Sequence, residues 1–156
     1  MIAIGEVDEA NSAIGVAIAA LSGGEPAFRL RQVQNELFDL GADIATPGEV
    51  DGALRIVSSQ VDRLEREIDA MNEPLPPLTS FILPGGSMAV SLLHLARGMV
   101  RRAERAAVAL AEAESVNPHA LAYLNRLSDL LFVAARHLAA AQGGDVLWQP
   151  GATRDS

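Results

Sequence analysis

The chain has 156 residues, 49% hydrophobic but only 4% aromatic, and it carries a net charge of −8 with no lysine and no cysteine. Its length suits one domain, and its aliphatic, alanine-rich composition favours packed helices over a β-sandwich. The lack of cysteine excludes disulfides and thiolate metal sites, and the acidic charge argues against non-specific nucleic-acid binding.

Apolar residues recur at helical spacing in five segments, with short connections between them. No segment alternates with period two for long enough to predict a strand, and the tail after Gly144 is expected to be irregular. The sequence therefore predicts an all-α fold, a five-helix bundle with mostly antiparallel neighbours. The expected helices cover about 4–21, 26–46, 59–73, 87–114 and 118–142.

Residues at the helix ends support these limits. Ser58 or Ser59 is the expected N-cap of the third helix, and Asn117 followed by Pro118 is a typical start for the fifth. No apolar stretch is long enough to predict a membrane span. The amino terminus lacks a basic segment and becomes acidic at Glu6, unlike a signal peptide, so we expect a cytoplasmic location.

Four of the twelve basic residues fall within nine positions of the fourth predicted helix. Arg97, Arg101 and Arg105 are four residues apart and share one face, where like charges repel unless an anion lies over them. One interpretation is a clamp for polyphosphate or carboxylate groups, which guanidinium groups bind bidentately. The other is a solvated face with ion pairs within the helix, for example to Glu104. Both stay open at this point.

An apolar stretch closed by a turn, Phe81 to Gly86, comes just before this helix. The arginines that follow it suggest a site for a phosphorylated molecule beside an apolar surface. On the fifth helix Asn125, Asp129 and Arg136 form a polar line, which in isolation is most often a solvent-facing edge.

The first predicted helix carries a stripe of small and polar residues opposite its apolar face: Asp8, Asn11, Ser12 and Gly15. The stripe is either ordinary surface or a face that lets another subunit approach, with Asp8 as an ion-pair partner. The three histidines lie on different helices without metal-ligand spacing, so no metal site formed by the protein is predicted.

Taken together, these segments resemble the PduO-type ATP:cob(I)alamin adenosyltransferases. The resemblance covers nearly the whole chain in the right order. The matching strings are GEVDEANS at 5–12, QNELFDLGAD at 34–43, FILPGG at 81–86, HLARGMVRRAER at 94–105 and YLNRLSDLLF at 123–132, and DVLW at 145–148 is similar to the carboxyl end of the family.

The resemblance implies a ferritin-like five-helix bundle that forms a homotrimer with active sites between subunits. It further implies transfer of the 5′-deoxyadenosyl group of ATP to cob(I)alamin, giving adenosylcobalamin and triphosphate, with Mg²⁺ accompanying ATP. An adenosylcobalamin-dependent mutase would receive the product. Neither nucleic acid nor a membrane is expected as a partner.

The resemblance also assigns roles to individual residues. Phe81 would lie below the corrin ring and exclude the lower axial ligand of cobalt, and Arg97 would pair with Asp8 across the subunit interface. Arg101 would be the principal, catalytic contact of the triphosphate. The residues expected to bind ATP are Arg101, Arg102, Glu104, Arg105 and Asn125.

One family segment is expected to be missing from the predicted single domain, residues 1–156. Members normally begin with a Thr-x-Thr-Gly-Asp-x-Gly-type segment that wraps ATP phosphates, whereas this chain starts almost at the helix that follows it. An alternative function is therefore a cobalamin-binding or delivery module with weak or no ATP chemistry. A third interpretation is a structural helical trimer in which the arginines form only interface ion pairs.

Overall fold

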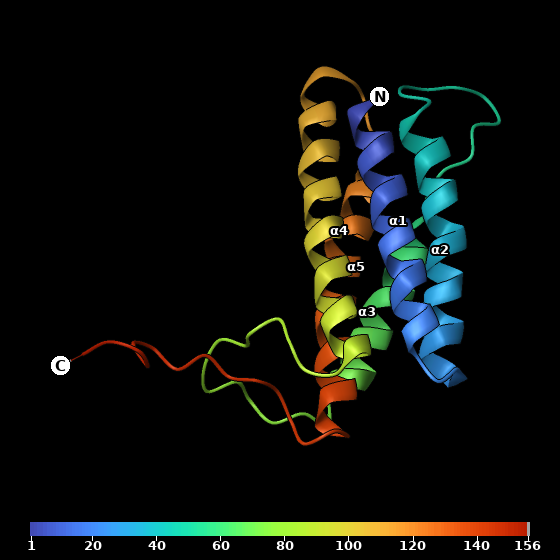
Figure 1. Cartoon of the computed structure of the whole chain (residues 1–156). Helices are drawn as coiled ribbons and strands as arrows, with labels where there is room; N and C mark the ends of the chain where they lie inside the picture. The colour runs from blue at the N-terminus through green and yellow to red at the C-terminus, as the bar shows by residue number, and fades with distance from the viewer. Residues whose placement is uncertain (156) are drawn as a thin grey trace.

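The computed structural model describes residues 1–155 and consists of five helices that form one bundle (Figure 1). Consecutive helices run antiparallel, which confirms the predicted all-α bundle; Ser156, the last residue of the predicted domain, lies outside the described residues. Within 1–155 no helix is both long and apolar enough to span a membrane. The helices are α1 (Ile2–Ala20), α2 (Gly24–Ile44), α3 (Ser58–Asn72), α4 (Met88–Ala113) and α5 (Pro118–Ala140).

The most extensive packing joins antiparallel neighbours, α1 with α4 and α4 with α5, while α2 packs on α1 and α3 on α5, and all five helices contribute to one buried core. Both α1 and α4 bury an alanine at every seventh residue: Ala3, Ala10 and Ala17 on α1, and Ala89, Ala96 and Ala103 on α4. Small side chains at this spacing allow two helices to approach closely along their length. This packing explains how the chain fills its core with so few aromatic residues.

The predicted N-cap of α3 is wrong by one or two residues. The helix begins at Ser58, and Val57 is its N-cap residue. The side-chain oxygen of Gln60 accepts a hydrogen bond from the backbone N–H of Val57 at 2.9 Å, while the N–H of Gln60 donates to the carbonyl of Val57. Because Gln60 supplies the side-chain half of the cap, no serine is needed at the N-cap position.

Asn117 caps α5 as predicted, since its Oδ1 accepts a hydrogen bond from the N–H of His119 at 3.0 Å and Pro118 is the first helical residue. The helix ends at Ala140, two residues before the predicted end at about residue 142. The N–H of Gly144, which has a positive φ, returns to the carbonyl of Ala139 at 2.8 Å and closes this end.

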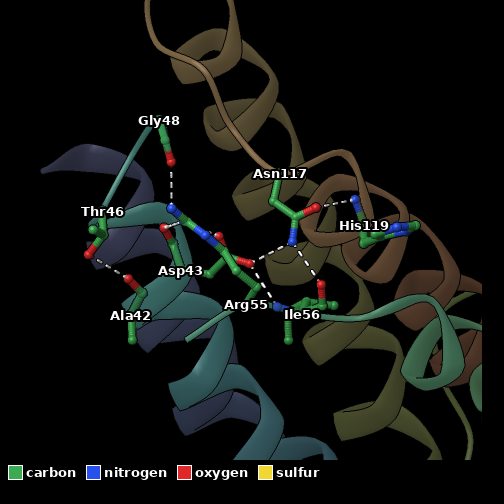
Figure 2. Close-up of polar contacts among 8 residues, drawn as sticks. All are labelled: Ala42, Asp43, Thr46, Gly48, Arg55, Ile56, Asn117 and His119. Carbon is green, nitrogen blue, oxygen red and sulfur yellow. Dashed lines mark hydrogen bonds and ion pairs between the residues drawn. The ribbon is translucent and has the colours of Figure 1, made fainter. Parts of the chain in front are cut away.

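A buried carboxylate joins three segments at the end of the bundle where α2 stops and α5 begins (Figure 2). Asp43, only 1% exposed, accepts hydrogen bonds from the guanidinium of Arg55, the N–H of Ile56 and the amide of Asn117, each at 2.8 Å. Arg55 also donates to the carbonyl of Gly48 at 2.6 Å. This Asp43 clasp (Asp43, Arg55, Ile56 and Asn117) fixes the start of α5, the helix that carries Asn125.

Candidate functional site

A chain of polar side chains connects α4 to α5. On α4, Glu104 shares its carboxylate: Oε1 lies 2.8 Å from the guanidinium of Arg101, and Oε2 accepts a hydrogen bond from the amide of Asn125 on α5 at 2.8 Å. The amide oxygen of Asn125 accepts from Arg126 at 2.7 Å, and Arg126 pairs with Asp129 at 2.9 Å. We call Arg101, Glu104, Asn125, Arg126 and Asp129 the α4–α5 polar chain; its charges alternate and its net charge is zero.

The arginines of the stripe differ in their ion-pair partners. Arg101 is braced by Glu104, as the spacing allowed, and its side chain is 45% exposed against 14% for Glu104. Arg105 is exposed and forms no ion pair within residues 1–155. Two neighbouring guanidinium groups are therefore balanced by one carboxylate, which leaves a cationic surface suited to phosphate oxygens.

Arg102 points away from the α4–α5 polar chain toward α1. Its Nε lies 2.6 Å from a carboxylate oxygen of Glu6, and one terminal nitrogen lies 2.6 Å from Glu9. Hydrogen bonds to Glu9 and Glu6 raise the pKa of Arg102. Within one chain this residue holds α1 against α4, and its role in binding ATP stays a prediction.

Arg97 packs on an aromatic ring rather than joining Arg101. Its guanidinium carbon lies 5.3 Å from the ring centroid of Phe132, a cation–π contact, and the ring of His94 meets the edge of Phe132 at 6.2 Å. His94 is buried, as expected of a packing histidine, and burial followed by the charge of Arg97 lowers its pKa.

Asp8, the predicted partner of Arg97, lies on α1 in a groove between α1 and α2. It is exposed and has no ion-pair partner among the described residues 1–155. The predicted Asp8–Arg97 pair therefore does not form within one chain.

Two members of the stripe on α1 lie against α2 of the same chain. For Asn11, which is buried there, the interpretation as a solvent-facing or subunit-facing residue is wrong, whereas Gly15 is only half-buried. Asn11 is buried; its amide donates to the carbonyl of Gln34 at 3.1 Å, and the amide of Gln34 donates back to the carbonyl of Asn11 at 3.3 Å. A Cβ at Gly15 would lie 3.0 Å from the same Gln34 side chain. A larger residue at Gly15 would push against the Gln34 side chain that makes this hydrogen bond.

Phe81 lies on a separate apolar surface near the start of α4. Its side chain is 77% exposed, and its ring centroid is 5.7 Å from that of Trp148 in the tail. Two backbone hydrogen bonds, from Leu83 to Val146 at 2.8 Å and from Trp148 to Phe81 at 2.9 Å, pair the two segments. The rise along α4 places the beginning of this helix roughly 20 Å from Arg101, so one chain presents the two regions separately.

Arg136 does not lie on a solvent-facing edge of α5, contrary to what its place in the polar line predicted. Only 7% of the residue is exposed, because its guanidinium donates to the carboxylate of Asp145 at 3.1 Å and to the carbonyl of Pro76 at 3.0 Å. Arg136 thus anchors both the tail and the segment before Phe81. Sequence reasoning also missed Arg126, although its position beside Asn125 and three residues before Asp129 could have identified it.

Comparisons with known proteins agree with one another. A family model described as cobalamin adenosyltransferase matches residues 1–138. The chain is 50% identical to the corrinoid adenosyltransferase of Mycobacterium tuberculosis (strain H37Rv), over 99% of this chain and 82% of that protein. It is 47% identical to the corrinoid adenosyltransferase of Bacillus subtilis (strain 168), over 95% of this chain and 79% of that protein.

Solved structures of similar proteins include the PduO-type ATP:corrinoid adenosyltransferase from Lactobacillus reuteri. A phenylalanine-to-histidine variant complexed with cobalamin and ATP superimposes with a TM-score of 0.88 at 36% identity, covering 95% of this chain and 82% of that chain. An arginine-to-lysine variant complexed with ATP gives a TM-score of 0.87 at 37% identity, covering 95% and 86%.

Proposed function

Because this chain belongs to the cobalamin adenosyltransferase family, we propose that it transfers the 5′-deoxyadenosyl group of ATP to the cobalt of cob(I)alamin. The cobalt(I) electron pair forms the new cobalt–carbon bond, and the bond between C5′ and the triphosphate oxygen breaks, releasing triphosphate. Since cobalt is the nucleophile, no side chain has to attack or remove a proton. The protein has to orient ATP and stabilise the negative charge of the leaving group.

The observation that carries this proposal is the carboxylate of Glu104, which holds Arg101 on one oxygen and Asn125 on the other. This arrangement fixes a guanidinium at an exposed surface without neutralising its neighbour Arg105. A triphosphate bound there would meet preorganised N–H donors as charge develops on its leaving oxygen. We include Mg²⁺ in the proposal as the ion that arrives with ATP and shares its phosphate oxygens.

The Lactobacillus reuteri structures support the choice of residues. The phenylalanine and the arginine replaced there are twenty positions apart in that chain, and so are Phe81 and Arg101 here. Phe81 offers an exposed apolar ring, supported by Trp148, that would exclude water and other ligands from the lower face of cobalt. Loss of that axial ligand makes reduction of cobalt(II) to the cobalt(I) nucleophile easier.

We propose a homotrimer as the working form. Asp8 and Arg97 form no ion pair with each other within one chain, and the groove beside Asp8 contains the exposed ring of Phe38. A second subunit would supply the missing partner for each. The resemblance to the family also supports a cytoplasmic location and an adenosylcobalamin-dependent mutase as recipient of the product.

The test is a spectroscopic assay with chemically reduced cobalamin and MgATP, following formation of the cobalt–carbon bond. We expect product with the unaltered protein and with Arg66→Ala, a control that removes an exposed arginine from α3. Arg101→Ala should weaken the use of ATP far more than cobalamin binding. Phe81→Ala should instead reduce the four-coordinate cobalt(II) state.

Phe28→Ala, which removes an exposed phenylalanine from α2, is the control for Phe81→Ala. Cobalamin binding by the unaltered protein without any product would contradict the proposed reaction. The reverse pattern for Arg101→Ala and Phe81→Ala would show that their roles are exchanged.

A further inference from the structure

We propose that Arg126 is a positioning residue that fixes the orientation of the Asn125 side-chain amide, and through it the place of Glu104 beside Arg101. The inference rests on the proposed function, because it assigns Arg126 to the ATP side of that reaction. Arg126 lies on α5 next to Asn125, within the string at 123–132 that resembles the family, but the resemblance assigned it no role and it is not part of the arginine stripe on α4.

The two ends of the Asn125 amide have partners of opposite charge. Its nitrogen donates to the carboxylate of Glu104 at 2.8 Å, and its oxygen accepts from the guanidinium of Arg126 at 2.7 Å. An amide turned by 180° would place its NH₂ group against the guanidinium and its oxygen against the carboxylate. Both contacts would then be repulsive, so the two charged neighbours together select one orientation.

Arg126 is itself held in place. The same terminal nitrogen that donates to Asn125 lies 2.9 Å from the carboxylate of Asp129, one helical turn further along α5. A terminal guanidinium nitrogen carries two hydrogens and can serve both oxygens at once. Its side chain is 36% exposed, so it can be replaced without leaving a buried charge unpaired.

Removal of Arg126 would leave the amide oxygen of Asn125 without its charged donor. Only Glu104 would then orient the amide, so the amide would be held less firmly. Its hydrogen bond to Oε2 of Glu104, whose side chain is only 14% exposed, would form for a smaller part of the time. Arg101 shares that carboxylate and would lose its fixed position. Loss of Arg126 should therefore weaken the use of ATP. It should not change the binding of cobalamin, which the proposal places at Phe81.

The experiment compares Arg126→Ala and Arg126→Lys with the control Arg66→Ala. For Arg126→Ala we expect KM for ATP to rise about tenfold, the loss expected for one charged hydrogen bond, and KM for cob(I)alamin to stay within about twofold. Arg126→Lys keeps the charge and should recover part of the loss. Thermal unfolding of both variants should match that of Arg66→Ala, which separates positioning from a loss of fold.

A second readout does not depend on turnover. The side-chain ¹⁵N–H₂ signals of Asn125, assigned by their loss in Asn125→Asp, should shift and broaden in Arg126→Ala but not in Arg66→Ala. An unchanged KM for ATP in an active protein, or an equal loss for both substrates, would overturn the inference, as would unchanged Asn125 signals. An inactive unaltered protein would count against the proposed function instead, and the Asn125 signals would still decide the role of Arg126.

Discussion

The carboxylate of Glu104 on α4 accepts a hydrogen bond from the amide of Asn125 on α5 at 2.8 Å, while its second oxygen lies 2.8 Å from Arg101. One side chain therefore sets the positions of a cation and an amide that belong to different helices. The geometry of the proposed ATP contacts depends on how α4 and α5 pack, and not only on the arginine motif.

Replacement of Glu104 by glutamine should weaken MgATP binding about tenfold or more. Glutamine keeps the shape but loses the charge, and it cannot accept hydrogen bonds on both side-chain ends. Calorimetric titration with MgATP measures the effect, with Glu112→Gln, an exposed position on the same helix, as the control. Unchanged or tighter binding would show that Glu104 opposes the phosphates rather than orienting Arg101.

Exchange of the charges at Asp8 and Arg97 tests the proposed subunit interface. Asp8→Arg alone should shift the protein toward lower mass, because two cations would meet where an ion pair is expected. The double variant Asp8→Arg, Arg97→Asp should restore part of the association. Sedimentation velocity gives the masses, and Asp62→Arg on the exposed face of α3 is the control. Equal masses for all variants would rule out the pair.

Asp43→Asn should lower the free energy of unfolding by about 3 kcal/mol, the typical cost of breaking a buried ion pair. The amide would present N–H groups to donors that now share the carboxylate, among them Arg55 and Asn117. Urea unfolding monitored by circular dichroism measures the loss, against Asp62→Asn at an exposed position. A loss of less than about 0.5 kcal/mol would mean that the clasp does not hold this end of the bundle.

The titration of His94 should lower the free energy of unfolding in mild acid. Burial and the charge of Arg97 lower its pKa in the folded protein, so the unfolded chain takes up a proton first as the pH falls. The stabilising contribution is therefore complete above the unfolded pKa of about 6.5 and decreases as the pH falls toward the folded pKa. Denaturant unfolding of the wild type and His94→Gln across this range checks the sign. Parallel pH profiles would contradict it.

Tyr123→Phe should leave the free energy of unfolding unchanged or raise it by up to about 1 kcal/mol. The hydroxyl is fully buried and forms no hydrogen bond of acceptable geometry among residues 1–155; burial raises its pKa, and the nearby guanidinium of Arg63 opposes this only in part. Removal of the hydroxyl therefore relieves an uncompensated polar group and leaves only a small gap. Thermal and urea unfolding measure the change. A loss of more than about 1 kcal/mol would show that the hydroxyl forms a hydrogen bond in the folded protein in solution.

The features that the sequence predicted correctly are those that depend on residues close together in the chain. Periodic apolar residues gave all five helices, and the spacing of Arg101 and Glu104 gave their pair, because both follow from one helix alone. The burial of Arg136 could not be foreseen, since its partners Asp145 and Pro76 come from other segments. Asn11 was misjudged for the same reason.

The remaining contacts of the candidate site could not be predicted from the sequence, because they join different helices. Asn125 was assigned by resemblance, but its bond to Glu104 needs the register of α4 against α5. Arg102 was grouped with its neighbours in the motif, whereas its direction around α4 brings it to Glu6 and Glu9 on α1. Residue type was visible in the sequence; the direction in which each side chain points was not.

The Asp43 clasp has a consequence for the order in which the chain assembles. Its hydrogen bond to Asn117 joins residues 74 positions apart, while Arg55 and Ile56 belong to the intervening loop. Closure over such a distance costs chain entropy before any contact repays it. The loop can therefore satisfy part of the carboxylate early. The hydrogen bond from Asn117, in contrast, can form only after the start of α5 has docked at the end of α2, so the Asp43 clasp is completed last, when the bundle is assembled.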